Sequence, residues 1–255
     1  STNDISKSLE KNGFFAATPI KTTYGKDIVE DDELYFILIN RLQGESLKAN
    51  DMYEGDYKSK ARFVGEIIGQ LSLALEKIDV IVNDVNIYEN VKNWALPKIK
   101  DLLYLPQTIC NDYLETFGGL YDNLPKQIIH RDPNPGNIIV SNDKWGFIDF
   151  ELSERNVRLY DPCYATSAIL SESFDENDID KLSKWIDIYK NIIYGYDTVA
   201  KLSDAERKAV PYVFLSNMFV CIAWFSEQEK YKELFEISKK MTKWAVENFN
   251  KLLIE

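Results

Sequence analysis

Apolar residues recur with helical spacing over most of the chain. Between residues 57 and 78 they return about every 3.6 positions, which is the period of one buried face of a helix. Isoleucine and leucine among flanking charges predict another helix at residues 3–12. The same kind of pattern predicts further helices at 84–104, 107–121, 161–171, 176–195, 203–225 and 228–253. Helices should therefore form the bulk of the fold.

Two regions depart from this period. Residues 19–23 and 34–42 are rich in β-branched and aromatic side chains and are separated by turn residues, which predicts a small antiparallel sheet. Short apolar runs between residues 127 and 149 are too brief for helices and predict strands that flank loops. We place the domain boundary after residue 43, with a β-element at 1–43 and a helical part at 44–255. The predicted fold class is α+β, mainly helical.

Composition narrows the range of partners. Of the 255 residues 45% are apolar, and 30 Lys and Arg against 41 Asp and Glu give a formal charge of -11. This charge disfavours binding to nucleic acid and favours neutral or cationic ligands, although an acidic surface also simply keeps a protein in solution. We expect no nucleic-acid partner.

Membrane insertion and export are not expected either. No run of about 18 apolar residues occurs, and the first residues are too polar for a signal peptide. The three cysteines, Cys110, Cys163 and Cys221, are odd in number and widely spaced, which predicts free thiols in a reducing compartment. The sequence thus predicts a cytoplasmic protein.

Candidate chemistry is concentrated at residues 128–149, IIHRDPNPGNIIVSNDKWGFID. Asp132 lies between two short predicted strands, where a loop would hold its carboxylate at a cleft. A carboxylate in that position can orient a hydroxyl group and accept its proton. The backbone angles around it are restricted by Pro133 and Pro135, whereas Gly136 permits a conformation that other residues would resist. The loop is therefore pre-shaped.

Two further residues of this segment suit a metal ion. Asn137 follows Asp132 by five positions, and Asp149 comes at the end of an apolar strand. Their oxygens are the hard ligands that suit Mg²⁺ on the phosphates of a nucleotide. Any one of these residues alone would indicate only a turn, but the ordered set predicts Mg²⁺-dependent phosphoryl transfer to a hydroxyl.

His130 is the only histidine in the chain. We predict that it packs beneath the loop, bonds to backbone and braces Asp132, and that it is neither a metal ligand nor a base. A Ser-His-Asp triad would need this same histidine, and no G-x-S-x-G sequence accompanies it.

With these residues in view, the chain resembles the aminoglycoside phosphotransferase and choline kinase-like families, which have a protein-kinase-like fold. The resemblance implies that Asp132 and Asn137 are catalytic, that Asn137 and Asp149 bind Mg²⁺, and that Asp161 braces the loop with His130. It also implies ATP or GTP as the phosphate donor. The strand and hinge at 35–42 would hold the base of this nucleotide. The residues implied to contact the nucleotide are Ile39, Asn40, Leu42, Ile139 and Ile148.

The resemblance is incomplete at the start of the chain. Kinases of this type carry a glycine-rich loop and a strand lysine well before the hinge, whereas here the first glycine is Gly13, and Lys7 and Lys11 lie in a helical pattern. The resemblance therefore implies that residues 44–255 are the C-terminal lobe and 1–43 a remnant of the N-terminal lobe, through fragmentation or natural loss. We expect impaired activity from such a chain. A protein kinase is not indicated, because the metal motif is D-F-E and no A-P-E follows.

The substrate and the activity stay open at this stage. Acidic and aromatic residues, among them Glu151 and Tyr164, would suit a cationic amine, yet most such aromatics belong to cores. An aminoglycoside, choline, another amino alcohol and a sugar all remain candidates. The alternative function is a catalytically silent binding or scaffold module. In either case the apolar strand near the hinge predicts self-association or a partner covering that edge.

Overall fold

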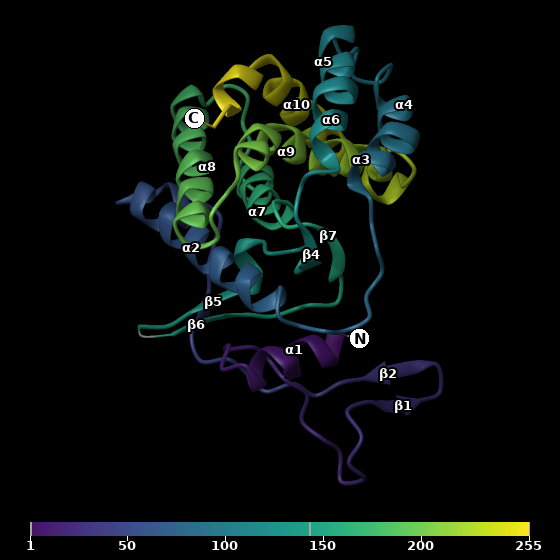
Figure 1. Cartoon of the computed structure of the whole chain (residues 1–255), viewed down its shortest axis with the longest axis vertical. Helices are drawn as coiled ribbons and strands as arrows, with labels where there is room; N and C mark the ends of the chain where they lie inside the picture. Colours follow the sequence, from purple (N-terminus) through teal and green to yellow (C-terminus); the bar gives the residue numbers. More distant parts are fainter. Residues whose placement is uncertain (1, 143, 255) are drawn as a thin grey trace.

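Helices form the main body of the protein, as the apolar periodicity predicted (Figure 1). The computed structural model describes residues 2–142 and 144–254. Its long helices are α1 (Thr2–Lys11), α2 (Tyr57–Leu75), α7 (Tyr160–Ser171), α8 (Ile179–Val199), α9 (Asp204–Phe225) and α10 (Lys232–Glu247). The fold class is therefore confirmed. The helix boundaries agree with the predicted ones to within four residues, except that α10 ends six residues before the predicted limit at 253.

Two of the predicted helices contain a wider turn in the middle. The first runs through α3 (Ile87–Asn90), a π-turn (Val91–Ala95) and α4 (Leu96–Ile99). The second runs through α5 (Gln107–Asp112), a π-turn (Tyr113–Phe117) and α6 (Gly118–Tyr121). The first ends several residues before position 104, the limit that the sequence predicted.

The strands form three small antiparallel sheets. These are β1 (Val29–Asp31) with β2 (Leu34–Phe36), then β3 (Glu45–Ser46) with β5 (Ile138–Val140) and β6 (Trp145–Phe147), and finally β4 (Lys126–Ile129) with β7 (Glu154–Val157). The prediction of a strand at 19–23 was wrong, because only an isolated bridge between Pro19 and Ile39 forms there. The strand that pairs with β2 is β1. Strand β7 was not predicted.

Helices α2 and α8 pack backbone against backbone. A Cβ atom at Gly65 would lie 2.0 Å from the carbonyl oxygen of Ile192, and one at Gly195 would lie 2.1 Å from that of Arg62. Glycine is unfavourable inside a helix. Its use at both positions is explained by this close approach, which any side chain would prevent.

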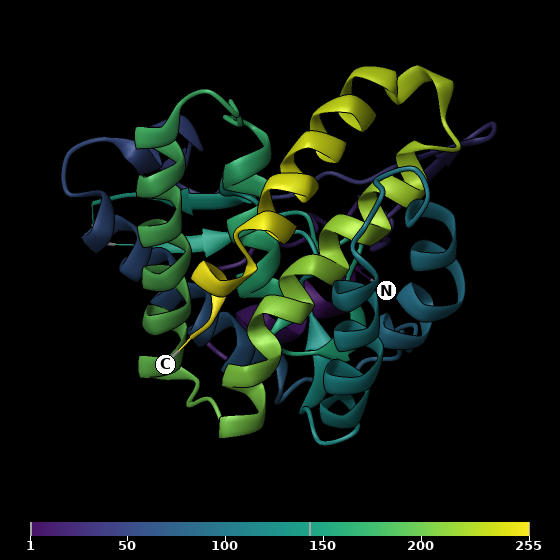
Figure 2. The ribbon, with the colours of Figure 1, turned by 90° about the horizontal axis from the view of Figure 1, so that it is seen from above.

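Helix α9 crosses the body beside α10 (Figure 2). Among the described helices it alone is long and apolar enough to span a membrane, yet 72% of that stretch is buried inside the fold. Ser203 and Glu206 cap its first turn reciprocally. Trp185 of α8 is fully buried and belongs to the core.

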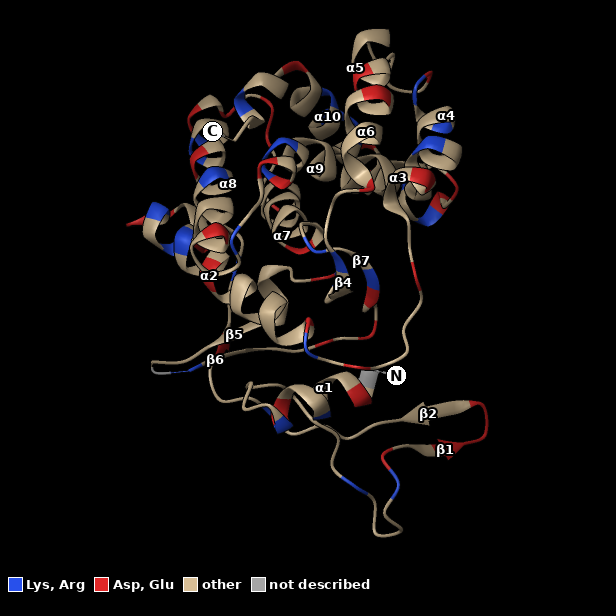
Figure 3. Ribbon diagram, viewed as in Figure 1, with Lys and Arg blue, Asp and Glu red and all other residues tan. Residues whose placement is uncertain are grey.

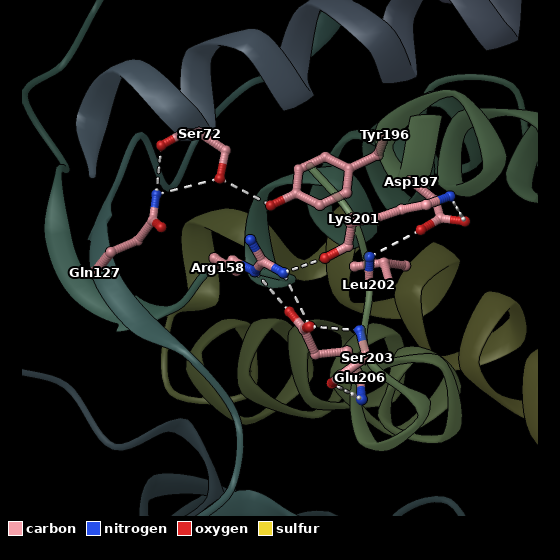
Figure 4. Close-up of polar contacts among 9 residues, drawn as sticks. All are labelled: Ser72, Gln127, Arg158, Tyr196, Asp197, Lys201, Leu202, Ser203 and Glu206. Atoms are coloured by element: carbon pink, nitrogen blue, oxygen red, sulfur yellow. Dashed lines mark hydrogen bonds and ion pairs between the residues drawn. The ribbon is translucent and has the colours of Figure 1, made fainter. Parts of the chain in front are cut away.

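A buried ionic network fixes the end of β7 to the connection between α8 and α9 (Figure 4). The Arg158 guanidinium donates to both carboxylate oxygens of Glu206, at 2.6 and 2.9 Å, and to the carbonyl oxygen of Lys201 at 2.6 Å. The bond to Glu206 raises the pKa of Arg158. Such a two-point pair orients both partners. The network therefore anchors the segment that leads into α7 and Asp161.

The first part of the N-terminal segment is attached to the body. Ile5 and Leu9 of α1 are buried in the main core. Ala16 then forms a parallel bridge with Phe147, and a Cβ atom at Gly146 would lie 2.2 Å from the carbonyl oxygen of Phe15. The segment at 13–18 thus runs directly against β6. The division into 1–43 and 44–255 stays a prediction.

The part of this segment that follows is largely exposed. It projects from the body as the β1 and β2 hairpin, whose turn is acidic (Figure 3). Its exposed apolar residues include Ile28, Val29, Leu34, Tyr35, Phe36, Ile37, Leu38 and Ile39.

Candidate active site

The Asp132 carboxylate is held in place by neighbouring side chains. It lies in the loop between β4 and β5. The Asn134 amide donates to its Oδ1 at 2.8 Å, and the Asn137 amide donates to its main-chain oxygen at 2.9 Å and to its Oδ2 at 3.3 Å. Burial raises the pKa of Tyr164 on α7, and the negative charge of Asp132 acts in the same direction. Asp132 is half-buried, so its carboxylate is both oriented and reachable.

Asp161, at the start of α7, supports the backbone under the loop. Its Oδ2 accepts from the N–H of His130 at 2.9 Å, and its Oδ1 accepts from the N–H of Arg131 at 2.8 Å. Only 2% of the residue is exposed. Burial raises its pKa to about 7, against the two backbone bonds, which favour the ionised form. One side chain thus fixes two consecutive peptide units before Asp132.

The fully buried His130 ring joins the two sides of the loop. Its Nε2 bonds to the carbonyl oxygen of Ile148 at 2.9 Å, and the Asp132 N–H donates to its Nδ1 at 3.3 Å. The ring lies 4.6 Å from that of Phe150, measured between centroids. Burial lowers the pKa of His130, so the ring is neutral, with Nε2 as donor and Nδ1 as acceptor.

The backbone is left-handed at two places in the site. Arg131 has φ of 73° and Asp149 has φ of 64°, values that are costly for residues other than glycine. The Nε of Arg131 lies 2.9 Å from a carboxylate oxygen of Glu154 on β7, which holds the first of these turns. The first of these residues precedes Asp132, and the second is Asp149 itself, so both concern side chains that the sequence singled out.

Asn137 and Asp149 are brought together by the pairing around β5 and β6. The N–H of Ile148 donates to the carbonyl oxygen of Asn137 at 3.1 Å, which places the following Asp149 beside Asn137. Asp149 is exposed. The Asn137 amide nitrogen is engaged with Asp132, so its amide oxygen is the atom suited to a cation. Two protein oxygens, completed by phosphate oxygens and water, fit Mg²⁺.

The described residues contain no group of three or more His, Cys, Asp and Glu side chains that would hold a metal ion by themselves. A cation at Asn137 and Asp149 would therefore take most of its ligands from outside the protein, as Mg²⁺ does when it is carried by nucleotide phosphates.

A small apolar cluster lies beside these residues and apart from the main core. Its buried members are Ala17, Leu42 and Ile139, and Phe15 and Ile148 pack against them. The structure thus brings together three of the five residues predicted to contact the base, namely Leu42, Ile139 and Ile148.

The other two predicted base contacts are placed differently. Ile39 is 47% exposed and lies outside the cluster. The Asn40 side chain accepts from the N–H of Thr18, and the Asn40 N–H donates to the Thr18 carbonyl oxygen at 3.0 Å. Phe15 and Ala17 were missed, although the apolar run at 14–17, which we assigned to no element, was a signal for them.

A pocket of about 410 Å³ opens next to the Asp132 loop. Asn134, which donates to Asp132, and Tyr164 form part of its wall. Helices α7, α9 and α10 supply the rest, which is mostly apolar: Ala168, Met218, Phe225, Leu234, Ile237 and Met241. This is the size of a small-molecule site.

Of the two predicted substrate contacts, only Tyr164 lies in this pocket. Glu151 is exposed and lines a different hollow with Ile5 and Asn83, so the structure does not bring it to the pocket. Sequence reasoning missed Glu172, an exposed carboxylate in the pocket lining, and Asn217 of α9. The only signal for Asn217 was a polar residue within the apolar run FLSNMFVC.

Cys221 of α9 is also part of the pocket wall. Burial raises the pKa of its thiol to about 11, and the negative charge of Asp132 acts in the same direction. Asn134 of the loop lines the same pocket as Cys221. The pocket and the loop therefore form one continuous site.

Comparison with known proteins agrees with this geometry. The chain matches the model of the phosphotransferase enzyme family over residues 3–190. A homoserine kinase from Phenylobacterium zucineum (strain HLK1) is 29% identical over 108 residues, which are 42% of this chain. The match covers 31% of that kinase, about a third of its length.

Solved structures show the same fold. A microcompartment-associated aminopropanol kinase superposes with a TM-score of 0.71 at 16% identity, covering 99% of this chain and 82% of that one. An amicoumacin kinase in complex with AMP-PNP and Ca²⁺ gives a TM-score of 0.67 at 14% identity, covering 95% and 76%. Since the family model spans well over half of the residues and the architecture agrees with these kinases, the chain belongs to the phosphotransferase enzyme family.

Proposed function

We propose that this protein transfers a phosphoryl group from a nucleoside triphosphate to a hydroxyl of a small molecule bound in the 410 Å³ pocket. One observation carries the proposal. Asp132 is held by Asn134, which also forms part of the pocket wall, while Asn137 on its other side leads to Asp149. A hydroxyl in the pocket would thus meet the carboxylate beside the place for the phosphates.

Each residue has a role that follows from its contacts. Asp132 orients the substrate hydroxyl and accepts its proton as the new O–P bond forms. Asn137 and Asp149 would hold Mg²⁺, which supplies neutralisation of phosphate charge when bound. His130 and Asp161 do not touch substrate, and they position Asp132 through the backbone.

The apolar cluster of Ala17, Leu42 and Ile139 gives the nucleotide base a surface to stack on. Because these contacts are apolar, they support a purine without choosing between ATP and GTP. The solved amicoumacin kinase holds an ATP analogue and a divalent cation, which supports the same donor class here.

For the acceptor we propose a compact amino alcohol. Glu172 supplies a carboxylate among mostly apolar neighbours in the pocket lining, which suits an amine on an apolar body. The names of the aminopropanol kinase and the homoserine kinase support an amino-bearing alcohol as acceptor.

A transfer screen tests this function. The protein is incubated with Mg-ATP or Mg-GTP and a panel of amino alcohols, homoserine, choline, sugars and aminoglycosides, and phosphorylated products are measured by mass spectrometry. We expect product from one amino alcohol or more, and none without divalent cation. No product from any compound with either nucleotide would reject the function.

A scaffold or binding module is the second candidate, favoured by the exposed apolar residues of the β1 and β2 hairpin. It predicts a stable complex with a partner protein and no Mg²⁺-dependent nucleotide binding. Nucleotide binding that requires Asp149 would argue against it.

A further inference from the structure

The pocket wall contains a buried amide without a partner. Asn217 of α9 is 1% exposed, and among the described residues neither its Oδ1 nor its Nδ2 has a hydrogen-bond partner. The residue lines the 410 Å³ pocket. A buried amide without partners costs stability, so its presence in the pocket wall calls for an explanation.

Ser216 and Asn156 are two buried polar side chains that do have partners. Ser216, the adjacent residue, bonds to the Tyr113 hydroxyl at 2.6 Å and donates to the Tyr212 carbonyl oxygen at 2.7 Å. Asn156, the other fully buried asparagine we consider, donates to Glu154 at 2.9 Å and accepts from the N–H of Val157 at 2.8 Å. Asn217 differs from both because it lines the pocket and its polar atoms bond to none of the described residues.

The position of Asn217 is close to the proposed chemistry. It lies one helical turn before Cys221, about 6 Å along the axis. Cys221 lines the same pocket and feels the charge of Asp132. Asn134, which donates to Asp132, lines this pocket as well, so one ligand in it can contact both Asn134 and Asn217.

We propose that Asn217 is a specificity-determining residue that binds a second, neutral polar group of the acceptor, such as a hydroxyl or an amide. This inference rests on the proposed function and narrows its substrate class. An amide side chain both donates and accepts, so it matches a group that does the same. The acceptor then carries three features: a hydroxyl for Asp132, an amine for Glu172 and a neutral polar group for Asn217.

The stability of Asn217→Leu gives a test that is independent of activity. Leucine has a similar size and lacks the unpartnered amide, so we expect an unchanged or higher melting temperature. Asn156→Leu is the matched control, and it should lower the melting temperature because it leaves the Val157 N–H without its side-chain acceptor and removes one of the bonds to Glu154. A drop in Asn217→Leu as large as that in Asn156→Leu would show a structural role and overturn the proposal.

Kinetics give the second test. The acceptors 2-amino-1,3-propanediol and 2-amino-1-propanol differ by one hydroxyl, and both are assayed for binding and transfer with wild type and Asn217→Leu. We expect wild type to prefer the diol at least 10-fold in kcat/KM, and Asn217→Leu to lose that preference through a raised KM for the diol with kcat changed much less.

The outcomes separate the two claims. If wild type transfers phosphate to these or other amino alcohols while Asn217→Leu leaves every KM unchanged, the role of Asn217 is wrong and the kinase function stands. If wild type transfers phosphate to nothing, the function itself fails. Equal affinity of wild type for the diol and its analogue would also overturn the role of Asn217.

Discussion

The two sides of the site are built differently. In the Asp132 loop polar side chains bond to one another and to backbone: Asp132 to Asn134 and Asn137, and Asp161 to two peptide N–H groups. In the pocket wall Asn217 is buried with no partner among the described residues.

This difference separates chemistry from recognition. A carboxylate that must meet a hydroxyl in one geometry benefits from being fixed before the substrate arrives. A wall that must recognise a ligand keeps its bonding capacity for that ligand, at some cost in stability. We therefore expect substitutions in the loop to reduce turnover and substitutions in the wall to change substrate affinity.

Asp132→Asn should have the largest effect. The amide keeps the shape of the side chain but cannot accept the hydroxyl proton, so kcat should fall by at least about 100-fold. Steady-state assays with the best acceptor measure this. The melting temperature should change by only a few degrees, and near-normal turnover in the variant would show that Asp132 is not the base.

Asp161→Ala should reduce stability as well as turnover. It leaves the N–H groups of His130 and Arg131 buried without acceptors, at about 1 to 3 kcal/mol each, partly offset because a buried carboxyl is removed. Urea unfolding measures the loss. The control is Asp180→Ala at an exposed position of α8, which should stay within about 0.5 kcal/mol of wild type.

Asn134 belongs both to the Asp132 loop and to the pocket wall, so Asn134→Ala should affect both. It removes one bond to Asp132, while Asn137 still holds the carboxylate, so kcat should fall by about 10-fold, equivalent to roughly 1.4 kcal/mol. Because Asn134 also lines the pocket, KM should change too. The exposed Asn93→Ala is the matched control. A change in neither constant would mean that the loop and the pocket work independently.

His130 predicts a pH dependence of stability. Burial lowers its pKa below the ordinary value, so below about pH 6.5 the unfolded chain takes up a proton that the folded chain does not. This residue's contribution is therefore present above that pH and lost as the pH falls, by at most about 1.4 kcal/mol per pH unit. Asp161, whose pKa is raised, acts in the opposite direction.

The comparison of wild type with His130→Gln isolates the histidine. Urea unfolding between pH 5 and pH 7.5 should show that the difference in unfolding free energy between the two proteins narrows as the pH falls. A difference that stays constant with pH would mean that His130 is not buried in its neutral form.

The smallest effect concerns the exposed hairpin. Leu34, Tyr35 and Phe36 are 62%, 69% and 51% exposed, so weak self-association through this edge is expected at high concentration. Light scattering measures it, and Phe36→Glu should reduce it without changing kcat. A clean monomer at high concentration would contradict the expectation.

Local patterns predicted the helices and singled out the polar residues of the Asp132 loop. Their failures have physical causes. Strand β7 was missed because Glu154 and Asn156 are buried polar residues, so the alternation typical of a strand is absent. The pocket was not predictable as a unit because its wall combines α7, α9 and α10, which meet only through tertiary packing. Tyr164 was proposed as a substrate contact on residue type alone. Asn217 could be recognised only from the structure, in which its amide has no hydrogen-bond partner among the described residues.

Calorimetric titration of Mg-ATP and Mg-GTP tests the central claim, that the loop holds a metal nucleotide beside the pocket. We predict that wild type binds at least one of them only with Mg²⁺, that Asp149→Asn loses this binding, and that Asn217→Leu keeps it, because only the first changes the metal side. Binding that is unaffected by Asp149→Asn, or no binding by wild type, would contradict the account.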